Sequence, residues 1–78
     1  MAKNVFNESD IDQTASRLKA VAHPLRLAMV CLLAHGERTV TDICNELGTT
    51  QPNISQHLSL LHGQGLLKSR NEENRRFY

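Results

Sequence analysis

The segment from Thr50 to His62 constrains the fold of this chain more than any other stretch. Thr50 is a favourable N-cap residue, and a proline two positions later suits a first helical turn, where its missing N–H has no intrahelical partner to lose. Ile54, Leu58 and Leu61 then recur at intervals of four and three residues, which places them in one stripe along a helix. The segment therefore predicts a helix that packs one narrow apolar face against a core.

The opposite face of this predicted helix carries small and amide side chains and almost no charge. It consists of Pro52, Ser55, Gln56 and Ser59. Short hydroxyl and amide side chains hydrogen-bond base edges, and they let a helix backbone approach the floor of the major groove. The pattern favours a DNA recognition helix. A polar surface helix that happens to lack charge is the alternative, and the helix alone leaves both readings open.

A second short helix is predicted over residues 40–47, directly ahead of the first. Thr39 and Asp42 form a start like a capping box, with Asp where Glu is commoner, and Gly48 closes the helix. Its apolar stripe is Val40, Ile43, Cys44 and Leu47. Two short helices joined by a turn of three or four residues that contains glycine are typical of a helix-turn-helix, although an ordinary helical hairpin has the same outline.

Two further helices are predicted upstream, over residues 9–21 and 24–34. Ser9 is the expected N-cap of the earlier helix, which ends before Pro24 because the residue ahead of a proline avoids the α region. The later helix is apolar on nearly all sides, and Arg26 is its one charged residue. A helix without a polar face is buried on several sides. We therefore expect it at the centre of the domain, with part of its burial supplied by a partner subunit.

Downstream of the recognition helix, residues 66–70 and 75–78 flank a polar turn at 71–74 and predict a β-hairpin. The hairpin contains four cations, which are Lys68, Arg70, Arg75 and Arg76. A basic hairpin directly after a recognition helix acts as a wing, whose side chains reach phosphates or a minor groove. A solvated charged hairpin is the alternative, and it applies best to Glu72 and Glu73.

The length of 78 residues allows one small domain with a thin core, for which oligomerisation is a common source of extra stability. We expect residues 1–8 to be a flexible tail and residues 9–78 to form a winged helix-turn-helix domain, mainly α with a small β-hairpin. Residues 1–49 contain five basic and six acidic groups, a net charge of −1, whereas residues 50–78 contain four and two, a net charge of +2. The positive charge of the C-terminal part favours DNA binding, as the predicted recognition helix does.

Several functional classes are disfavoured by the sequence. No apolar run is long enough to span a bilayer, and the N-terminus lacks a signal-peptide pattern, so we expect a cytoplasmic protein without membrane contact. No catalytic Ser-His-Asp set or carboxylate pair stands out, which argues against an enzyme. His57 and His62 are five residues apart, the wrong spacing for metal ligands on one helix face. Neither a metal nor a cofactor is indicated.

Several segments together resemble the ArsR/SmtB family of bacterial winged-helix repressors over about residues 17–78. They are Leu18-Lys19-Ala20-Val21-Ala22-His23-Pro24-Leu25-Arg26-Leu27, Val40-Thr41-Asp42-Ile43, Gln51-Pro52-Asn53-Ile54-Ser55-Gln56-His57-Leu58, Leu61 and Gly65-Leu66-Leu67. The resemblance implies a homodimer that represses by binding palindromic operator DNA and releases it when a small inducer arrives. It also implies DNA contacts at Gln51, Ser55 and Gln56, of which Gln51 lies off the uncharged face.

Nine residues are predicted to contact DNA: Gln51, Asn53, Ser55, Gln56, Ser59, Lys68, Arg70, Arg75 and Arg76. Two rival functions stay open. One is a winged-helix module for protein–protein assembly that does not bind DNA. The other is a small redox or metal-storage protein built around its two cysteines, Cys31 and Cys44, whose spacing disfavours it.

The chain departs from the family pattern in two ways. Arsenic and cadmium sensors have Cys-Val-Cys-Asp-Leu where this chain has Thr39-Val40-Thr41-Asp42-Ile43, and threonine lacks the thiolate that soft metals require, so we expect no metal site there. The family's C-terminal dimerisation helix has no counterpart before Tyr78. We therefore expect either a trimmed chain or a dimer that depends more on the helix at 9–21.

Cys31 is a candidate redox-sensing residue. It resembles the cysteine in the second helix of the family's redox and persulfide sensors, whose partner lies in the C-terminal helix that is missing here. Packing in the core is the alternative, because free cysteines are among the most buried residues. Cys44 lies on the apolar stripe of the helix at 40–47, which predicts a core position.

Overall fold

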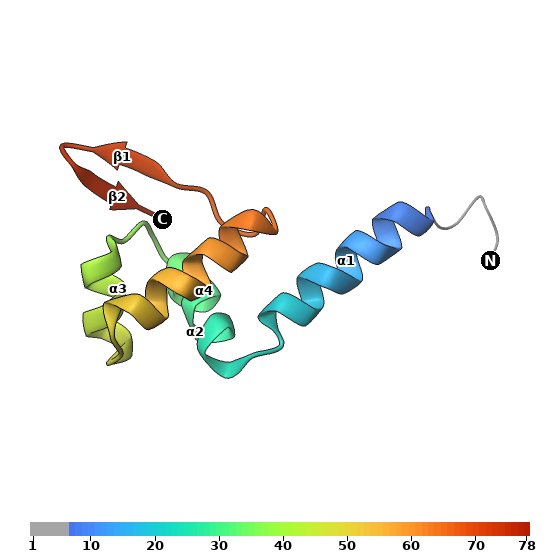
Figure 1. The fold of residues 1–78 in the computed structure, drawn as a ribbon, viewed down its shortest axis with the longest axis horizontal. Helices are drawn as coiled ribbons and strands as arrows, with labels where there is room; N and C mark the ends of the chain where they lie inside the picture. The colour runs from blue at the N-terminus through green and yellow to red at the C-terminus, as the bar shows by residue number, and fades with distance from the viewer. Residues whose placement is uncertain (1–6) are drawn as a thin grey trace.

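The computed structural model describes residues 7–78 of the chain. Four helices are followed by a two-stranded antiparallel hairpin, which confirms the predicted winged helix-turn-helix (Figure 1). In chain order, the elements are α1 (Glu8–Val21), α2 (Pro24–Leu33), α3 (Val40–Leu47), α4 (Gln51–Gly63), β1 (Arg70–Glu72) and β2 (Arg75–Phe77). Within the described range, no helix has the length and apolar character needed to cross a membrane.

The core lies where α2, α3 and α4 meet. The apolar stripe predicted for α4 is confirmed, since Ile54, Leu58 and Leu61 are almost completely buried. Met29 of α2 and Ile43 of α3 complete the set of fully buried large side chains. Burying side chains of this size contributes about 1.5–3 kcal/mol each. The recognition helix is therefore fixed to the domain by one face, and the opposite face stays exposed.

The N-terminal helix begins at Glu8, and its N-cap is Asn7 instead of the predicted Ser9. The side-chain oxygen of Asn7 accepts hydrogen bonds from the backbone N–H groups of Ser9 and Asp10, at 2.9 Å and 3.3 Å. Asparagine is among the best N-cap residues, which explains why the helix is capped at Asn7 and not at Ser9. The predicted tail at residues 1–8 lies, apart from its last two positions, outside the described residues.

The body of α1 extends away from the other helices, and only its C-terminal half contacts them (Figure 1). Arg17 holds this contact by donating from Nε to the backbone carbonyl of Gln64 at 3.0 Å, next to a 3.3 Å hydrogen bond from Ser16 to the Gln64 side chain. Ile11 and Leu18 are 40% and 63% exposed. Within the described part of one chain, α1 therefore leaves an apolar face uncovered.

Within residues 7–78, α2 is only partly buried, and the prediction assigned the rest of its burial to a partner subunit. Met29 is its one fully buried residue, Leu27 is 50% exposed, and Cys31 is exposed as well. Because α1 points away and the chain has few other elements, nothing in residues 7–78 covers this side of α2. Apolar composition alone identified the helix, and the described part of the chain encloses only some of its faces.

The caps of the helix-turn-helix are partly as predicted. Thr39 and Asp42 form a reciprocal capping box, in which each side chain accepts the other's backbone N–H at 3.1 Å. Gly48 ends α3 in the left-handed region, at φ 68°. Thr50 occupies the N-cap position of α4, but its side chain makes no capping hydrogen bond. The entry to α4 is held instead by Asn53, whose amide donates to the hydroxyl of Thr49 at 3.0 Å.

The hairpin is shorter and tighter than predicted. Its turn has two residues, Glu73 and Asn74, both with positive φ, instead of the four at 71–74. Two successive left-handed residues give a turn whose twist matches that of the flanking strands. The first strand begins at Arg70 and not at residue 66, because Leu66 and Leu67 pack against the core.

An isolated β-bridge at Thr39, which the sequence analysis missed, attaches the hairpin to the helix-turn-helix. Arg38 and Tyr78 exchange backbone hydrogen bonds at 3.1 Å and 3.0 Å, and Thr39 forms an isolated bridge with Phe77. Thr39 is also the N-cap of α3. The wing and α3 are thus joined through two adjacent residues, Arg38 and Thr39.

Candidate nucleic-acid interface

The face of α4 opposite the core is exposed, as its composition predicted. Gln51, Gln56 and Ser59 are exposed, and Ser55 is half-buried at the edge of this face. Asn53 is a weaker candidate than predicted, because it is half-buried and its amide group is already bonded to Thr49. The exposed side of α4 therefore presents amides and hydroxyls without a formal charge.

The two flanks of α4 face different parts of the domain. One flank includes Gln51 and His62 and faces the hairpin, where the His62 ring lies 3.4 Å from the Ser69 hydroxyl. The other flank includes His57 and Gln64 and faces α1 and the turn before α2. The uncharged face thus has the wing along one side only.

A hollow of about 290 Å³ lies between the start of α4 and the wing. It is lined by Thr39, Val40, Thr41, Gln51, Asn74, Arg75 and Arg76. The helical wheel placed Gln51 away from the uncharged face, and the structure brings it together with two of the predicted cations. Thr41 and Asn74 are additions that the sequence analysis did not single out.

The four predicted cations of the wing differ in whether a carboxylate pairs with them. Arg70 is paired with Glu37 at 2.5 Å and with Glu72, and its guanidinium lies over the Phe77 ring at 4.5 Å. The hydrogen bond from Arg70 lowers the pKa of Glu72, and the two carboxylates, Glu72 first, raise the pKa of Arg70. Arg70 is therefore largely neutralised by its neighbours.

Arg75, Arg76 and Lys68, by contrast, form no ion pair with any residue in the described part of the chain. Arg76 donates to the Ser69 hydroxyl at 3.0 Å and lies over the Tyr78 ring at 5.4 Å, while Arg75 lies 5.5 Å from the Phe77 ring. These contacts hold the two guanidinium groups without cancelling their charge. Arg75 and Arg76 are thus the wing residues best suited to meet a phosphate.

The histidines do not form a metal site, and no group of three or more His, Cys, Asp or Glu side chains between residues 7 and 78 is arranged to hold a metal ion. The rings of His23 and His57 lie 5.0 Å apart, beside Arg26. Burial, and then the nearby His23 and Arg26, lower the pKa of His57. His57 thus belongs to the contact between α4 and the start of α2.

The two cysteines occupy different environments. Cys44 is half-buried and packs against the core, in line with its place on the apolar stripe of α3. Cys31 is exposed, so the core-packing alternative for this residue is wrong within one chain. Solvent access is one of the two conditions for a reactive thiol, the other being a lowered pKa.

Residues 23–69 match the model of the arsR family of bacterial regulatory proteins. This chain is a member of the ArsR family. A curated relative, the biofilm growth-associated repressor of Xylella fastidiosa, is 35% identical over 71 residues, which are 91% of this chain and 62% of the relative. The chain therefore spans less than two thirds of that protein's length.

Two solved structures that are similar in sequence have the same fold. HlyU from Vibrio cholerae superposes with a TM-score of 0.84 at 33% identity, over 100% of this chain and 78% of HlyU. The homodimeric winged helix-turn-helix DNA-binding domain of Mb0332 from Mycobacterium bovis gives a TM-score of 0.84 at 35% identity, over 100% of this chain and 73% of that domain. The ArsR-type winged helix-turn-helix thus accounts for the whole described chain.

Proposed function

We propose that this protein is a sequence-specific DNA-binding transcriptional repressor that acts as a cytoplasmic homodimer. The single observation that carries the proposal is the uncharged, exposed face of α4 beside two wing arginines that have no carboxylate partner among residues 7–78. Amides and hydroxyls read base edges, and unpaired guanidinium groups bind phosphates. The name of the Xylella fastidiosa relative supports repression as the outcome of binding.

In this proposal, α4 lies in the major groove with its N-terminal half toward the bases. Gln51, Ser55, Gln56 and Ser59 contact base edges or nearby phosphates, and Asn53 has a lesser part in orienting the start of the helix. Arg75 and Arg76 contact the backbone beside the hollow at Gln51. Lys68 adds a further phosphate contact, and Arg70 adds a weaker one, since Arg70 must first give up its carboxylate partners.

A dimer follows from the apolar surface that one chain leaves uncovered. Ile11 and Leu18 on α1 are exposed, and the similar domain of Mb0332 is homodimeric. A two-fold dimer would place its two recognition helices about one turn of DNA apart and read a palindrome. The operator is therefore expected to be a pair of inverted half-sites.

Release of the operator requires an inducer, and Cys31 is the residue we propose for a redox or persulfide signal. Its thiol is exposed on α2. The comparison that tests this role is DNA release by an organic persulfide, by arsenite and by metal ions, each with the wild type and with Cys31→Ser. Release by persulfide that survives in Cys31→Ser would exclude this cysteine as the sensor.

The DNA-binding proposal is tested by selecting duplexes from a random pool and measuring affinity by fluorescence anisotropy. Gln56→Glu places a negative charge against the DNA and should weaken binding by roughly tenfold or more, since like charges at an interface cost several kcal/mol. Gln13→Glu changes the net charge equally on an exposed face of α1 and serves as the matched control. Equal affinities of the two variants at matched salt would contradict the assignment of the α4 face.

The rival function, a winged-helix module for protein–protein assembly, makes a different prediction in the same experiment. It predicts no retention on any duplex at low salt, and therefore no enriched sequence in the selection. Retention that falls steeply with added salt would instead indicate phosphate contacts.

A further inference from the structure

A hollow of about 260 Å³ lies on the α1 side of α4, the flank opposite to the wing. It is bordered by α1, the first turn of α2 and the C-terminal part of α4, and its lining residues are Ser16, Lys19, Ala20, Arg26, Leu60 and Gln64. None of these six residues is acidic, and none of them lines the hollow at Gln51. The hollow is therefore a separate basic surface beside the recognition helix.

Two hydrogen bonds fix the position of α1 beside α4 at this hollow. The Nε of Arg17 donates to the backbone carbonyl of Gln64 at 3.0 Å, and the Ser16 hydroxyl donates to the side-chain oxygen of Gln64 at 3.3 Å. Both donors lie within one helical turn of Lys19, whose side chain is exposed. Lys19 is therefore held on a wall whose place relative to α4 is set.

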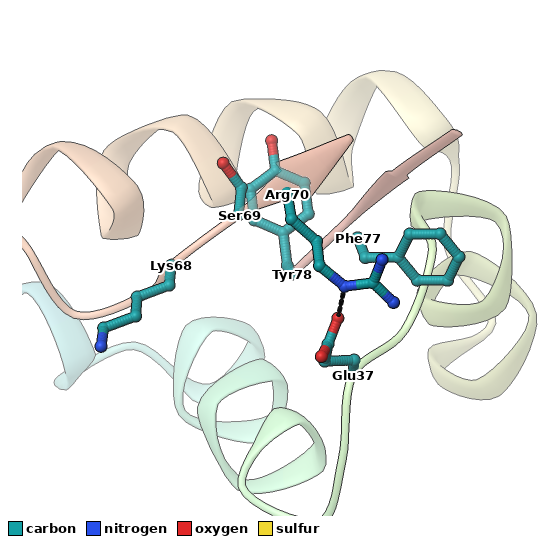
Figure 2. A pocket seen from close by; sticks show the side chains of 6 residues that line it. All are labelled: Glu37, Lys68, Ser69, Arg70, Phe77 and Tyr78. Atoms are coloured by element: carbon teal, nitrogen blue, oxygen red, sulfur yellow. Dashed lines mark hydrogen bonds and ion pairs between the residues drawn. The ribbon is translucent and has the colours of Figure 1, made fainter. Parts of the chain in front are cut away.

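The two cations of the hollow, Lys19 and Arg26, are not neutralised by the described chain. They form no ion pair with any residue between 7 and 78. The Nε of Arg26 is buried and has no hydrogen-bond partner in this range, although buried polar groups are almost always paired. The pocket at the base of the wing differs, because its Arg70 guanidinium is bonded to Glu37 (Figure 2). The α1 side of α4 thus offers unpaired positive charge, which fits an anion.

The dimensions of duplex DNA place a backbone on each side of a recognition helix. The major groove is about 12 Å wide, and an α-helix with its side chains is about 10–12 Å across. A helix that enters the groove therefore brings both of its flanks close to phosphates. The wing lies along one flank of α4, and the hollow lies along the other. The strand that passes the α1 side of α4 would meet Lys19 and Arg26.

Leu60 suits the hollow to a nucleic-acid backbone more than to a free inorganic anion. It is 43% exposed and directly follows Ser59 of the uncharged face. Backbone contacts in protein–DNA complexes involve the sugar as well as the phosphate oxygens. An exposed leucine next to two cations complements both the apolar surface of a deoxyribose and the charge of its phosphate.

We propose that this hollow is a second phosphate site for the operator, in which Lys19 and Arg26 bind the backbone at the groove edge opposite to the wing. Gln64, whose side-chain oxygen accepts from Ser16, keeps its amide N–H groups for a phosphate oxygen. This inference rests on the proposed function, because it requires α4 to lie in the major groove. It assigns DNA contacts to α1 and α2, neither of which contains any of the nine predicted contact residues.

Lys19→Gln tests the site through the salt dependence of binding to the selected duplex, followed by fluorescence anisotropy. It should weaken binding by about threefold to fivefold, the size expected for one exposed ion pair, and lower the slope of log affinity against log salt by about 0.9 for each half-site bound. Lys19→Arg keeps the charge and should keep the slope. Gln13→Glu changes the net charge of α1 equally outside the hollow and should also keep it. A wild-type slope in Lys19→Gln, or an equal loss in Gln13→Glu, would overturn the proposal.

Replacing single phosphates of the duplex with neutral methylphosphonates locates the contact. For the wild type, replacements at both edges of the major groove should weaken binding. Lys19→Gln should no longer respond to replacements at the edge away from the wing, and Arg75→Ala should no longer respond to those at the wing edge. A merely structural change in α1 would not give this separation. Loss of response at the same phosphates in both variants would overturn the proposal.

Arg26→Gln is the second variant, and it is paired with urea unfolding because the Nε of Arg26 is buried. If it folds with wild-type stability, it should lose salt slope as Lys19→Gln does, and a full slope would remove Arg26 from the site. If it does not fold, the exposed Lys19 decides the proposal. Duplex binding with the wild-type slope in both variants would overturn this inference alone. No binding of the wild type to any duplex would contradict the proposed function, and this inference with it.

Discussion

At the scale of single residues, the charge pairing within the wing decides which cations can contact DNA. Arg70 and Arg75 lie on facing strands and both stack on Phe77. Among the described residues, Arg70 has two carboxylate partners, Glu37 and Glu72, and Arg75 has none. Pairing with a phosphate requires Arg70 to break these contacts first. Arg75 has no such contacts to break, so the two arginines should differ in their contribution to binding.

We therefore expect Arg75→Ala to weaken DNA binding more than Arg70→Ala. Each phosphate contact removed should lower the slope of log affinity against log salt by about 0.9, so Arg75→Ala should reduce the slope by nearly one and Arg70→Ala by much less. Anisotropy titrations at several salt concentrations measure both quantities. An equal loss of slope in the two variants would show that the pairing with Glu37 and Glu72 does not weaken the phosphate contact of Arg70.

His57 predicts how stability depends on pH. Its pKa is lowered in the folded state, mainly by burial, so the unfolded chain binds more protons in the window just below the ordinary value of 6.5. The stabilisation is complete above pH 6.5 and is lost as the pH falls through 6.5 toward the folded-state pKa. Urea unfolding between pH 5 and 8 should show this slope, and His57→Gln should flatten it.

The matching control for His57 is His35→Gln, at an exposed residue, which should retain the slope of the wild type. The acidic groups with lowered pKa values, Asp42 and Glu72, titrate below this pH window and do not contribute to it. A slope that persists in His57→Gln would assign the pH dependence to another group.

At the scale of elements, the link between the wing and α3 depends on Thr39. This residue caps α3, is buried, and bridges to Phe77 in the hairpin. Thr39→Ala should lower the free energy of unfolding by about 1 kcal/mol, the usual loss for an N-cap hydroxyl. Thr41→Ala, at an exposed position in the same helical turn, should change it by less than about 0.5 kcal/mol. Urea unfolding compares the two variants. Equal losses of unfolding free energy would show that the Thr39 cap adds no stability beyond that of an ordinary exposed threonine.

Local signals predicted the helices well and the wing less well. The i, i+4, i+7 stripe of α4 and the caps at Thr39 and Gly48 depend on neighbours in sequence, and they gave the correct elements. The segment at 66–70 has the length of a strand, but Leu66 and Leu67 pack against the core. The first strand therefore begins only at Arg70. The pairing of Arg70 with Glu37 spans 33 residues, so no local pattern could indicate it.

At the scale of the whole molecule, the unpartnered faces of α1 and α2 show that one chain does not complete its own apolar packing. Leu18 and Leu27 are each at least half exposed, and α1 reaches away from the domain that the other elements form (Figure 1). Exposed apolar side chains gathered on one projecting helix, as Ile11 and Leu18 are on α1, indicate an interaction site more strongly than scattered ones do. A second copy that packs along α1 would cover this surface and set the distance between the two recognition helices.

Leu18→Glu should therefore shift the protein from dimer to monomer in analytical ultracentrifugation. Its effect on the stability of the monomer should be small, because Leu18 is 63% exposed in the single chain. Operator affinity should fall together with dimerisation, since a monomer engages one half-site and loses the gain from binding two linked sites. Gln13→Glu adds the same charge on the opposite face of α1 and should stay dimeric. A Leu18→Glu variant that remains a dimer would place the interface elsewhere, and one that becomes monomeric with full operator affinity would show that a single wing and recognition helix suffice for binding.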